Sequence, residues 1–284
     1  MVTCVPGGRA RSALSGGPGR RFADVRWVAE TGSTNADAME LAHQGEPEGI
    51  VLVTDHQTAG RGRAGRTWTA PPGAGLLLSI LLRPPAAVAD LCTMAVAVAA
   101  ASAIGSVAGL SPRLKWPNDL VWPGDGSGPD RKLAGILAEA DWPASSSVAA
   151  GWKAPAAHDK AVVVVGIGIN VTWPDDLPDD LADIAVALNH IIDAPVDRED
   201  LLTALLDALG PRYEAMVRGD RAGLLDEWRS RSATLGRQVR IDLGTDDVEG
   251  TAIDITHEGH LIVETSEGKR RTYAVGDVVH LRPV

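Results

Sequence analysis

The segment VVVVGIGIN at residues 162–170 restricts the fold more than any other part of this sequence. Its side chains do not alternate between apolar and polar, which is typical of a strand whose two faces are both buried. Valine and isoleucine also favour strands, because their branched side chains pack well on a pleated surface. The segment therefore predicts a central strand, and Gly166 and Gly168 thin the sheet where a flat ligand can lie.

Other patterned segments predict further elements before residue 235. Strands are expected at residues 25–28, 50–54, 75–83 and 133–139, and a turn is expected between 114–116 and 121–122. For 75–83 the periodicity alone does not exclude a buried helix. Helices are expected at 33–43, with Ser33 or Thr34 as N-cap, and at 88–107 and 200–218. A surface loop or a long hairpin is expected at 140–160, and a solvent-exposed loop at the acidic segment 175–183.

Short strands at close spacing follow Leu235. They are expected at 239–242, 249–255, 261–265, 269–274 and 278–281, separated by turns that contain glycine. This pattern predicts a small β-barrel of about fifty residues. The first residues are rich in Gly, Pro, Ser and Arg, with little to bury. We therefore expect a disordered tail at 1–21, a larger domain at 22–232 and the barrel at 233–284.

Charge and cysteine content argue against several classes of protein. The 284 residues include 27 Lys+Arg and 37 Asp+Glu, and the net charge of −10 disfavours bulk binding to nucleic acid or to an anionic membrane. Cys4 and Cys92 are the two cysteines, so neither a disulfide framework nor a cysteine-based metal site is expected. The most apolar stretch, 94–101, is shorter than the ~20 residues that span a bilayer. We expect a cytoplasmic protein.

Residues 57–68, QTAGRGRAGRTW, give the strongest signal for ligand binding. Glycines alternate with Arg61, Arg63 and Arg66. Glycine lets the backbone approach a ligand closely, and arginine supplies planar, permanently charged donors for carboxylates and phosphates. Repulsion among the three guanidinium groups predicts a mobile loop that a polyanionic ligand would order. A solvent-exposed basic loop is the alternative interpretation of this run taken alone.

The same loop contains G-x-G-x-x-G, a pattern shared with dinucleotide-binding proteins and kinases. A dinucleotide site requires a helix directly after the glycines, and the following TWTAPP does not start a helix. A kinase requires H-R-D and D-F-G motifs further on, and neither occurs. The pattern therefore supports neither class.

Three further segments place polar groups at turns or strand ends. ETGSTN at 30–35 is an N-cap whose free N–H groups can also receive an anion or a carbonyl. The proline of KWPNDL at 115–120 forces a turn that brings Lys115, Asn118 and Asp119 together, although a salt-bridged turn is the commoner outcome. In RKLAGIL at 131–137, Lys132 begins an apolar strand, where snorkelling at the sheet end is the alternative to a site. Gly135 marks a close backbone approach.

In their order and spacing, ETGSTN, QTAGRGRAGRTW, KWPND, RKLAGIL and GIGIN resemble the biotin–protein ligases, or biotin–[acetyl-CoA carboxylase] ligases. The resemblance extends to Trp228 and SATLG at 232–236, before that family's small SH3-like domain. It implies an α/β fold: a mixed-sheet catalytic domain related to class II aminoacyl-tRNA synthetases and lipoate ligases, then an SH3-like barrel. It also implies a short form, because the pattern starts near residue 25 and leaves no room for a DNA-binding helix-turn-helix.

The resemblance implies a ligase that forms a C–N bond in two steps. Biotin and ATP first give biotinyl-5′-AMP and pyrophosphate, and a lysine of a biotin carboxyl carrier domain then takes the biotinyl group. The implied cofactors are ATP and the Mg²⁺ that arrives on its phosphates, with biotin as substrate. The implied partner is the carrier domain of an acetyl-CoA, other acyl-CoA or pyruvate carboxylase, with no DNA and no membrane. A monomer or a homodimer is expected.

The resemblance also implies the site residues. Those implied to bind biotin are Ser33, Thr34, Asn35, Gln57, Arg61, Gly62, Arg63, Trp68, Lys132 and Gly135. Those implied to bind ATP or the adenylate are Arg61, Arg63, Arg66, Lys115, Asn118, Asp119, Lys132 and Asn170. Lys132, Arg63 and Asp119 are implied to be catalytic, with Asp119 orienting or deprotonating the acceptor lysine, and no residue is expected to bind a metal. Trp68 is implied to pack the closed loop over the valeryl chain.

The chain departs from the family pattern in two places that matter. Thr67 stands where a lysine is often found, and the acidic segment after Asn170 matches the family's adenylate-binding loop poorly. The residues that contact adenine are therefore undefined, with Trp173 as one candidate for stacking. Two other hypotheses remain: a lipoate or octanoate ligase, which shares the fold but is expected to lack GRGRxGR and KWPND, and a module that binds anions without turnover.

Overall fold

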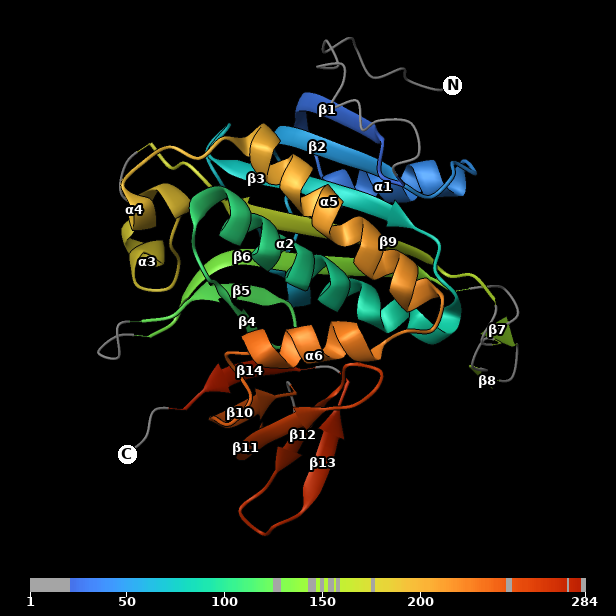
Figure 1. Cartoon of the computed structure of the whole chain (residues 1–284), viewed down its shortest axis with the longest axis vertical. Helices are drawn as coiled ribbons and strands as arrows, with labels where there is room; N and C mark the ends of the chain where they lie inside the picture. The colour runs from blue at the N-terminus through green and yellow to red at the C-terminus, as the bar shows by residue number, and fades with distance from the viewer. Residues whose placement is uncertain are drawn as a thin grey trace.

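The computed structural model describes residues 21–124, 129–142, 147–148, 151–152, 156, 159–174, 177–243, 247–274 and 276–281. The tail predicted at 1–21 lies outside the described residues apart from Arg21, as do parts of the loops predicted at 140–160 and 175–183. Figure 1 shows a sheet with helices packed on it and, next to this, a smaller all-β body made by the last strands of the chain.

The larger body contains a seven-stranded sheet in the order β1-β2-β3-β9-β6-β5-β4. β1 and β2 are parallel and all other neighbours are antiparallel, so the sheet is mixed as expected. The predicted central strand is confirmed, because β9 lies between β3 and β6. The strands are β1 (Asp24–Thr31), β2 (Ile50–Gln57), β3 (Gly75–Leu82), β4 (Arg113–Lys115), β5 (Asp119–Trp122), β6 (Arg131–Asp141) and β9 (Val162–Asn170).

Helices cover both faces of this sheet. On one face, α1 (Thr34–His43) places Ala38 and Ala42 in a cluster with Ile50, Leu81 and Val164. On the other face lie η2 (Ala86–Leu91), α2 (Cys92–Ala108) and α5 (Arg198–Val217), over the alternate residues of the same strands (Figure 1). Because successive side chains of a strand point to opposite faces, an uninterrupted apolar strand is what two covering layers require.

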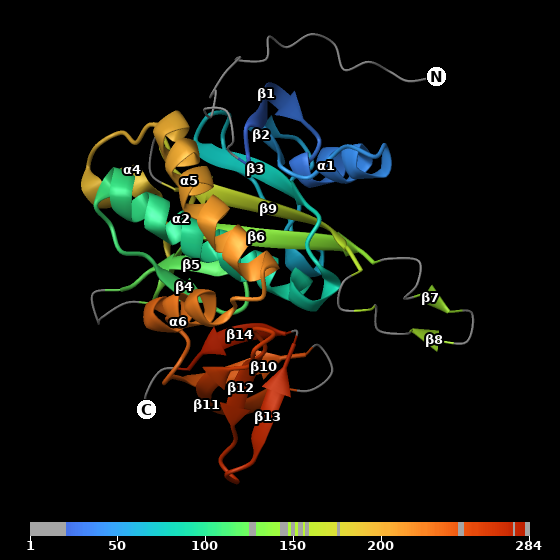
Figure 2. The same ribbon diagram turned by 45° about the vertical axis from the view of Figure 1, so that its right-hand side comes forward.

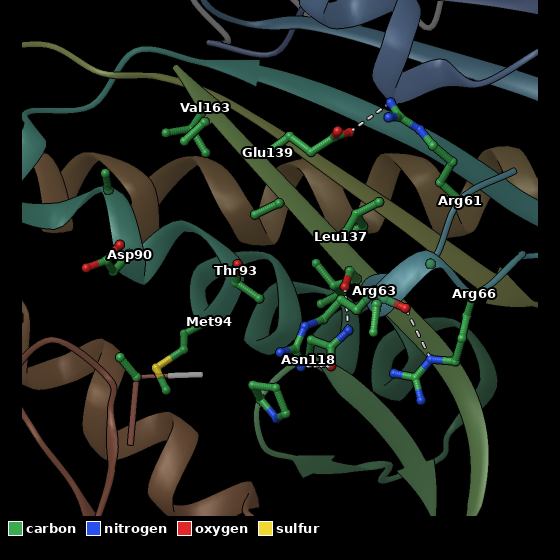
Figure 3. A pocket seen from close by; sticks show the side chains of 18 of the residues that line it. Arg61, Arg63, Arg66, Asp90, Thr93, Met94, Asn118, Leu137, Glu139 and Val163 are labelled. Carbon is green, nitrogen blue, oxygen red and sulfur yellow. Dashed lines mark hydrogen bonds and ion pairs between the residues drawn. The ribbon is translucent and has the colours of Figure 1, made fainter. Parts of the chain in front are cut away.

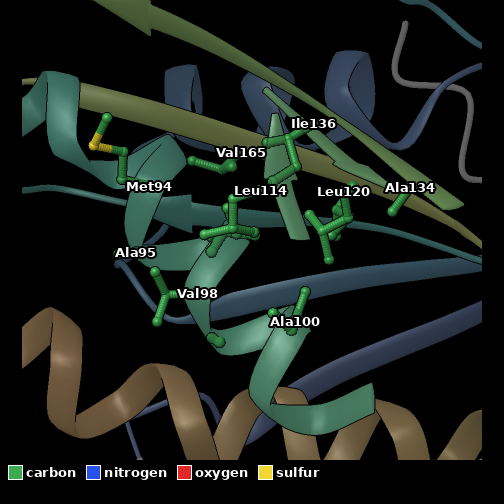
Figure 4. Close-up of a cluster of buried hydrophobic side chains, with 14 of the residues drawn as sticks. Met94, Ala95, Val98, Ala100, Leu114, Leu120, Ala134, Ile136 and Val165 are labelled. Carbon is green, nitrogen blue, oxygen red and sulfur yellow. The ribbon is translucent and has the colours of Figure 1, made fainter. Parts of the chain in front are cut away.

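The apolar helical segment is longer than the stretch 94–101 that the sequence suggested. Ala86–Ala108 has 23 residues and a mean hydropathy of 2.0, so by length and composition it could cross a membrane. In the fold it is two-thirds buried, and α2 packs against α5 and against β6 and β9 of the sheet. Small side chains such as Ala95 and Val98 bring the helix close to Leu114, Ile136 and Val165 of the core (Figure 4). The segment therefore behaves as a core helix.

Several short elements were not predicted. They are η1 (Arg63–Gly65), α3 (Asp179–Ala182), α4 (Leu188–Ile192) and α6 (Ala222–Arg231). The short hairpin of β7 (Ser147–Val148) and β8 (Gly151–Trp152) lies in the segment 140–160, where a surface loop or a long hairpin was expected. The prediction of a loop throughout 175–183 was wrong at its end, where α3 forms one helical turn. Asp179 and Asp180 lie in the first turn of that helix, where free N–H groups favour negative charge.

The smaller body is a five-stranded antiparallel sheet in the order β13-β12-β11-β10-β14, which confirms the predicted strands. Its buried side chains alternate along the strands, as with Val239 and Ile241, or Leu261 and Val263. The strands are β10 (Gln238–Asp242), β11 (Asp247–Ile255), β12 (Leu261–Glu264), β13 (Arg270–Tyr273) and β14 (Asp277–His280).

Trp116 attaches the smaller body to the turn between β4 and β5. Its indole N–H donates to the carbonyl of Gly259 at 3.0 Å, and its backbone N–H donates to Thr234 Oγ1 at 3.0 Å. Both bonds are buried, where an unpaired donor would be costly. Figure 2 shows the C-terminal strands and α6 beside β4 and β5. The position of the KWPND turn therefore depends on the smaller body.

His280 gives this interface a pH dependence. Burial first, and then the positive charges of Lys115 and Arg237, lower its pKa to about 4, although Asp130 opposes the shift. The imidazole is therefore neutral at pH 7, with Nδ1 3.2 Å from Arg237 Nη1 and Nε2 3.1 Å from Thr234 Oγ1. In the unfolded chain the same group takes up a proton near pH 6.5.

We predict that the free energy of unfolding falls as the pH is lowered from 6.5 towards 4, since the unfolded chain then binds the proton more readily. The contribution of His280 is on the order of 2–3 kcal/mol. Urea unfolding at pH 7 and pH 4.5 should show a smaller loss for His280→Gln than for the wild type. Equal losses in the two proteins would contradict the prediction.

Candidate active site

The sequence motifs meet around a small cavity of about 50 Å³ between the N-terminus of α1, the 57–68 loop, β6 and β9. This is space for a few water molecules, because one water needs roughly 10–15 Å³ of such volume. The predicted site residues that line it are Ser33, Thr34, Asn35, Gln57, Arg61, Gly62, Arg63, Arg66, Trp68, Asn118, Lys132 and Gly135. Lys115, Asp119 and Asn170 lie outside the lining.

The N-terminus of α1 supplies one wall. Thr34 donates its backbone N–H to Gln57 Oε1 at 2.9 Å, and its hydroxyl lies 3.2 Å from the same atom. Ser33 is the N-cap but makes no side-chain capping bond, so its hydroxyl is not committed to the helix. Ser79 of β3 lies beneath, with its hydroxyl 2.7 Å from Thr34 Oγ1 and 2.6 Å from Asn35 Oδ1. This wall therefore presents a set of fixed, buried polar groups.

Carboxylates hold the three arginines of the loop. Arg61 pairs with Glu139 at 3.0 Å, and Arg66 pairs with Asp277 at 2.9 Å. Arg63 lies 3.4 Å from Asp277 and donates to Asn118 Oδ1 at 3.2 Å (Figure 3). The expected repulsion is thus offset by acids from β6 and β14. In place of a free loop, the structure shows one anchored to both bodies of the protein.

Two lysines flank Asp119. Lys132 Nζ lies 2.7 Å from Asp119 Oδ1 and 5.6 Å from the centre of the Trp68 ring, so the lysine points into the site and does not snorkel away from it. Burial lowers the pKa of Lys115; Asp119 opposes this shift and Lys132 adds to it. The predicted approach of Lys115, Asn118 and Asp119 is therefore extended by Lys132 to a cationic cluster around one carboxylate.

The glycines of β6 and β9 make room for side chains of the protein itself. A Cβ at Gly168 would lie 2.6 Å from Trp68 Cε2, and one at Gly135 would lie 2.9 Å from Lys132 Nζ. Gly166 accommodates the side chain of Asn35 in the same way. The indole of Trp68 therefore lies over Gly168, in the space where the sequence predicted a flat ligand. Its Nε1 is buried and has no hydrogen-bond partner among the described residues.

A wider groove of about 1,010 Å³ opens beside this cavity. It runs from the arginine loop past Asp90, Thr93 and Met94 to Trp116 and to the β11–β12 turn (Figure 3). The small cavity and the groove share Arg61, Arg63 and Arg66. A ligand held in the cavity is therefore reachable from the groove across the loop.

Two residues predicted near the nucleotide lie at the end of β9. Asn170 is buried and donates to the carbonyl of Val186 at 3.2 Å. Trp173 is 6% exposed and lies in a cluster with Ala74, Leu177 and Ala185. An indole enclosed in this way does not offer a face to adenine, so the structure argues against Trp173 as a stacking partner.

Similarity to known proteins identifies the family. Residues 28–146 match the biotin/lipoate A/B protein ligase family, and residues 234–281 match the biotin protein ligase C terminal domain. A biotin--[acetyl-CoA-carboxylase] ligase of Mycobacterium tuberculosis is 36% identical over 277 residues, which cover 95% of this chain and 92% of that protein. The chain belongs to the biotin protein ligase family. The resemblance drawn from the motifs is confirmed.

Two further biotin protein ligases show the extent of the likeness. The bifunctional ligase/repressor BirA of Bacillus subtilis is 34% identical over 85% of this chain and 70% of its own length. The biotin protein ligase of Aquifex aeolicus, solved in complex with biotin and ATP, superposes with a TM-score of 0.72 and 26% identity over 92% of this chain and 100% of that one. The predicted fold class is therefore confirmed as well.

Some residues of this site were not predicted. Ser79 is the one hydroxyl in the apolar strand GLLLSILL, which is a signal in itself, since a buried polar side chain needs a partner. Glu139 and Asp277 carry no comparable signal. Acidic residues at a strand end are common on surfaces, and their pairing with the arginines depends on the tertiary fold.

Proposed function

We propose that this chain is an ATP-dependent biotin–protein ligase. In the first step the biotin carboxylate attacks the α-phosphate of ATP; a P–O bond forms and pyrophosphate leaves. In the second step the neutral amine of an acceptor lysine attacks the acyl carbon, a C–N bond forms, and AMP leaves with the electrons of the C–O bond. The observation that carries the proposal is the convergence of Arg61, Arg63, Arg66 and Lys132 on one cavity lined by the family's motifs.

Positive charge is what the first step requires. Two anions must approach one another, and charge builds on the leaving pyrophosphate, so preorganised cations stabilise the transition state. Lys132 is proposed to contact the carboxylate and the α-phosphate, and Arg66 to face the phosphates. In exchanging Asp277 for substrate oxygens, Arg63 and Arg66 keep a paired environment throughout.

The opposite wall is proposed to hold the biotin ring. Ser33, Thr34, Asn35 and Gln57 offer both donors and acceptors, as a urea-like ring needs. The cavity of about 50 Å³ is too small for a bicyclic ring, so Trp68 has to withdraw from Gly168 when biotin enters. It then packs over the valeryl chain, and the closed loop keeps water from the anhydride.

Mg²⁺ is proposed to arrive with ATP and to neutralise charge on its phosphates. Among the residues that the structure describes, no group of three His, Cys, Asp or Glu is placed to hold a metal ion. Mg²⁺ usually keeps several waters and binds through substrate phosphates, so the proposal needs no dedicated protein site.

The acceptor is proposed to be the biotin carboxyl carrier domain of an acyl-CoA or pyruvate carboxylase in the cytoplasm. Asp119 holds Lys132 in the ligand-free protein. Once Lys132 turns to the adenylate, Asp119 is free to orient the incoming amine. An unperturbed lysine, with a pKa near 10.4, must lose a proton before it reacts.

The test is incubation of the purified protein with ATP, Mg²⁺, biotin and a carrier domain. We expect biotin-dependent release of pyrophosphate and a mass gain of one biotinyl group on the carrier. Lipoate in place of biotin is the control and should give neither. A gain of lipoyl mass would favour the lipoate ligase alternative, and binding of biotin without turnover would favour a binding module.

A further inference from the structure

A continuous chain of polar contacts joins the ring-binding wall to the arginine loop. Ser79 donates to Asn35 Oδ1 at 2.6 Å, and Asn35 Nδ2 donates to Glu139 Oε2 at 2.8 Å. The same Oε2 atom accepts from Arg61 Nη2 at 3.0 Å. One oxygen of the Glu139 carboxylate thus accepts hydrogen bonds both from Asn35 at the N-terminus of α1 and from Arg61 of the loop.

The orientation of Asn35 is fixed from several sides. Its amide also donates to the carbonyl of Leu137 at 3.1 Å, so both N–H groups are used and the carboxamide has one arrangement. Gly166 of β9 supplies the space, since any Cβ there would overlap the Asn35 carboxamide. Asn35 and Ser79 are buried, which strengthens their contacts relative to those in water. The donor that Asn35 offers to Glu139 therefore has a fixed position.

The three arginines are held by different parts of the protein. Arg63 and Arg66 pair with Asp277 of the smaller body, whereas Arg61 pairs with Glu139 of β6 in the seven-stranded sheet. Release of Arg63 and Arg66 to the phosphates leaves the Glu139–Arg61 contact in place, next to the biotin wall. Glu139 is thus placed to hold one end of the loop through the whole reaction.

Building on the proposed function, we propose that Glu139 is a positioning residue for biotin. It fixes Arg61 over the cavity and ties that position to Asn35, so that the wall and the loop close on the ligand as one unit. No hydrogen bond of this chain reaches Lys115, Asn118 or Lys132 on the nucleotide side, and Arg61 is its one member that is also implied to bind the nucleotide. Loss of the Glu139 carboxylate should therefore weaken biotin binding more than the use of ATP.

The test compares Glu139→Gln and Glu139→Ala with wild type in steady-state pyrophosphate release. Because a hydrogen bond to a charged group is roughly twice as strong as a neutral one, KM for biotin should rise about tenfold in Glu139→Ala and less in Glu139→Gln. KM for ATP and kcat at saturating biotin should change less than about threefold. Calorimetric titration of biotin without ATP should give a variant-to-wild-type ratio of Kd for biotin that equals the ratio of KM values, because this measurement does not depend on turnover.

Asp141→Asn is the matched control. Asp141 lies two residues further along the same strand and pairs with His43 at 2.6 Å, outside the site. Its substitution should leave both KM values unchanged. A rise in both KM values for the Glu139 variants, or a KM for biotin equal to that of wild type, would overturn the proposal.

A double-mutant cycle tests the route through Arg61. If Glu139 acts by holding Arg61, then Glu139→Gln in an Arg61→Met background should add little to the loss of biotin affinity. Additive losses would overturn the proposal, because independent residues add. Failure of the proposed function would look different, since the wild type would then release no pyrophosphate in response to biotin.

Discussion

Replacement of Lys132 by alanine is expected to lower biotin-dependent pyrophosphate release by at least about a hundredfold, the scale seen when one preorganised donor to developing charge is removed. Lys132 Nζ is 2.7 Å from Asp119 and over Trp68, inside the cavity that the motifs line. Its loss removes the cation proposed to bridge the biotin carboxylate and the α-phosphate. It also leaves Asp119 with Lys115 as its remaining flanking cation, so less positive charge faces the incoming ATP.

Separation of the two half-reactions sharpens this test. With biotinyl-5′-AMP supplied directly, Lys132→Ala should transfer biotin to the carrier domain with a smaller loss than it shows in adenylate formation. Lys132→Arg keeps the charge and should retain part of the activity. Lys269→Ala, at an exposed lysine of the smaller body, is the control and should match wild type. Pyrophosphate release by Lys132→Ala at the wild-type rate would refute the assignment.

The sequence predicted those parts of the fold that local patterns determine. The run of valines in β9 predicted a strand that is buried on both faces, and β9 lies in the middle of the sheet, between β3 and β6. The spacing of glycine-bounded strands after Leu235 likewise predicted each strand of the smaller body. By contrast, α3 and α4 are single turns, too short for an apolar repeat to mark them.

For the proposed site, the sequence named candidate residues but not the groups that they contact. The motifs contain Arg61, Arg63 and Lys132, and these residue types by themselves indicate binding to carboxylates or phosphates. The partners Glu139, Asp119 and Asp277 come from β6, β5 and β14, which are distant in sequence. The order of the strands in space decides such pairs, so the sequence predicted repulsion among the arginines but not the carboxylates that offset it. The interaction of Trp68 with Gly168 was hidden for the same reason.

Arg63→Gly is expected to leave adenylate formation largely intact and to release biotinyl-5′-AMP about ten to a hundred times faster, as the loss of charge-assisted bonds predicts. Arg63 reaches Asn118, the Gly276 carbonyl and Asp277, so it joins the loop to both bodies of the protein. Without it the loop over the site loses its central attachment. Adenylate retention can be followed by a filter assay with labelled ATP and biotin. Free adenylate should also biotinylate added lysine-containing proteins that are not carriers.

Loop flexibility has to be separated from the loss of the guanidinium group, because glycine changes both. Ala64→Gly is the matched variant: Ala64 has a φ of 52°, a left-handed conformation that glycine adopts readily, and its side chain has no group to pair. It should retain the adenylate as wild type does, whereas Arg63→Gly should not. If both variants lose the adenylate equally, backbone freedom accounts for the effect and the role assigned to Arg63 is wrong. If neither loses it, closure of the site depends on Arg61 and Arg66 instead.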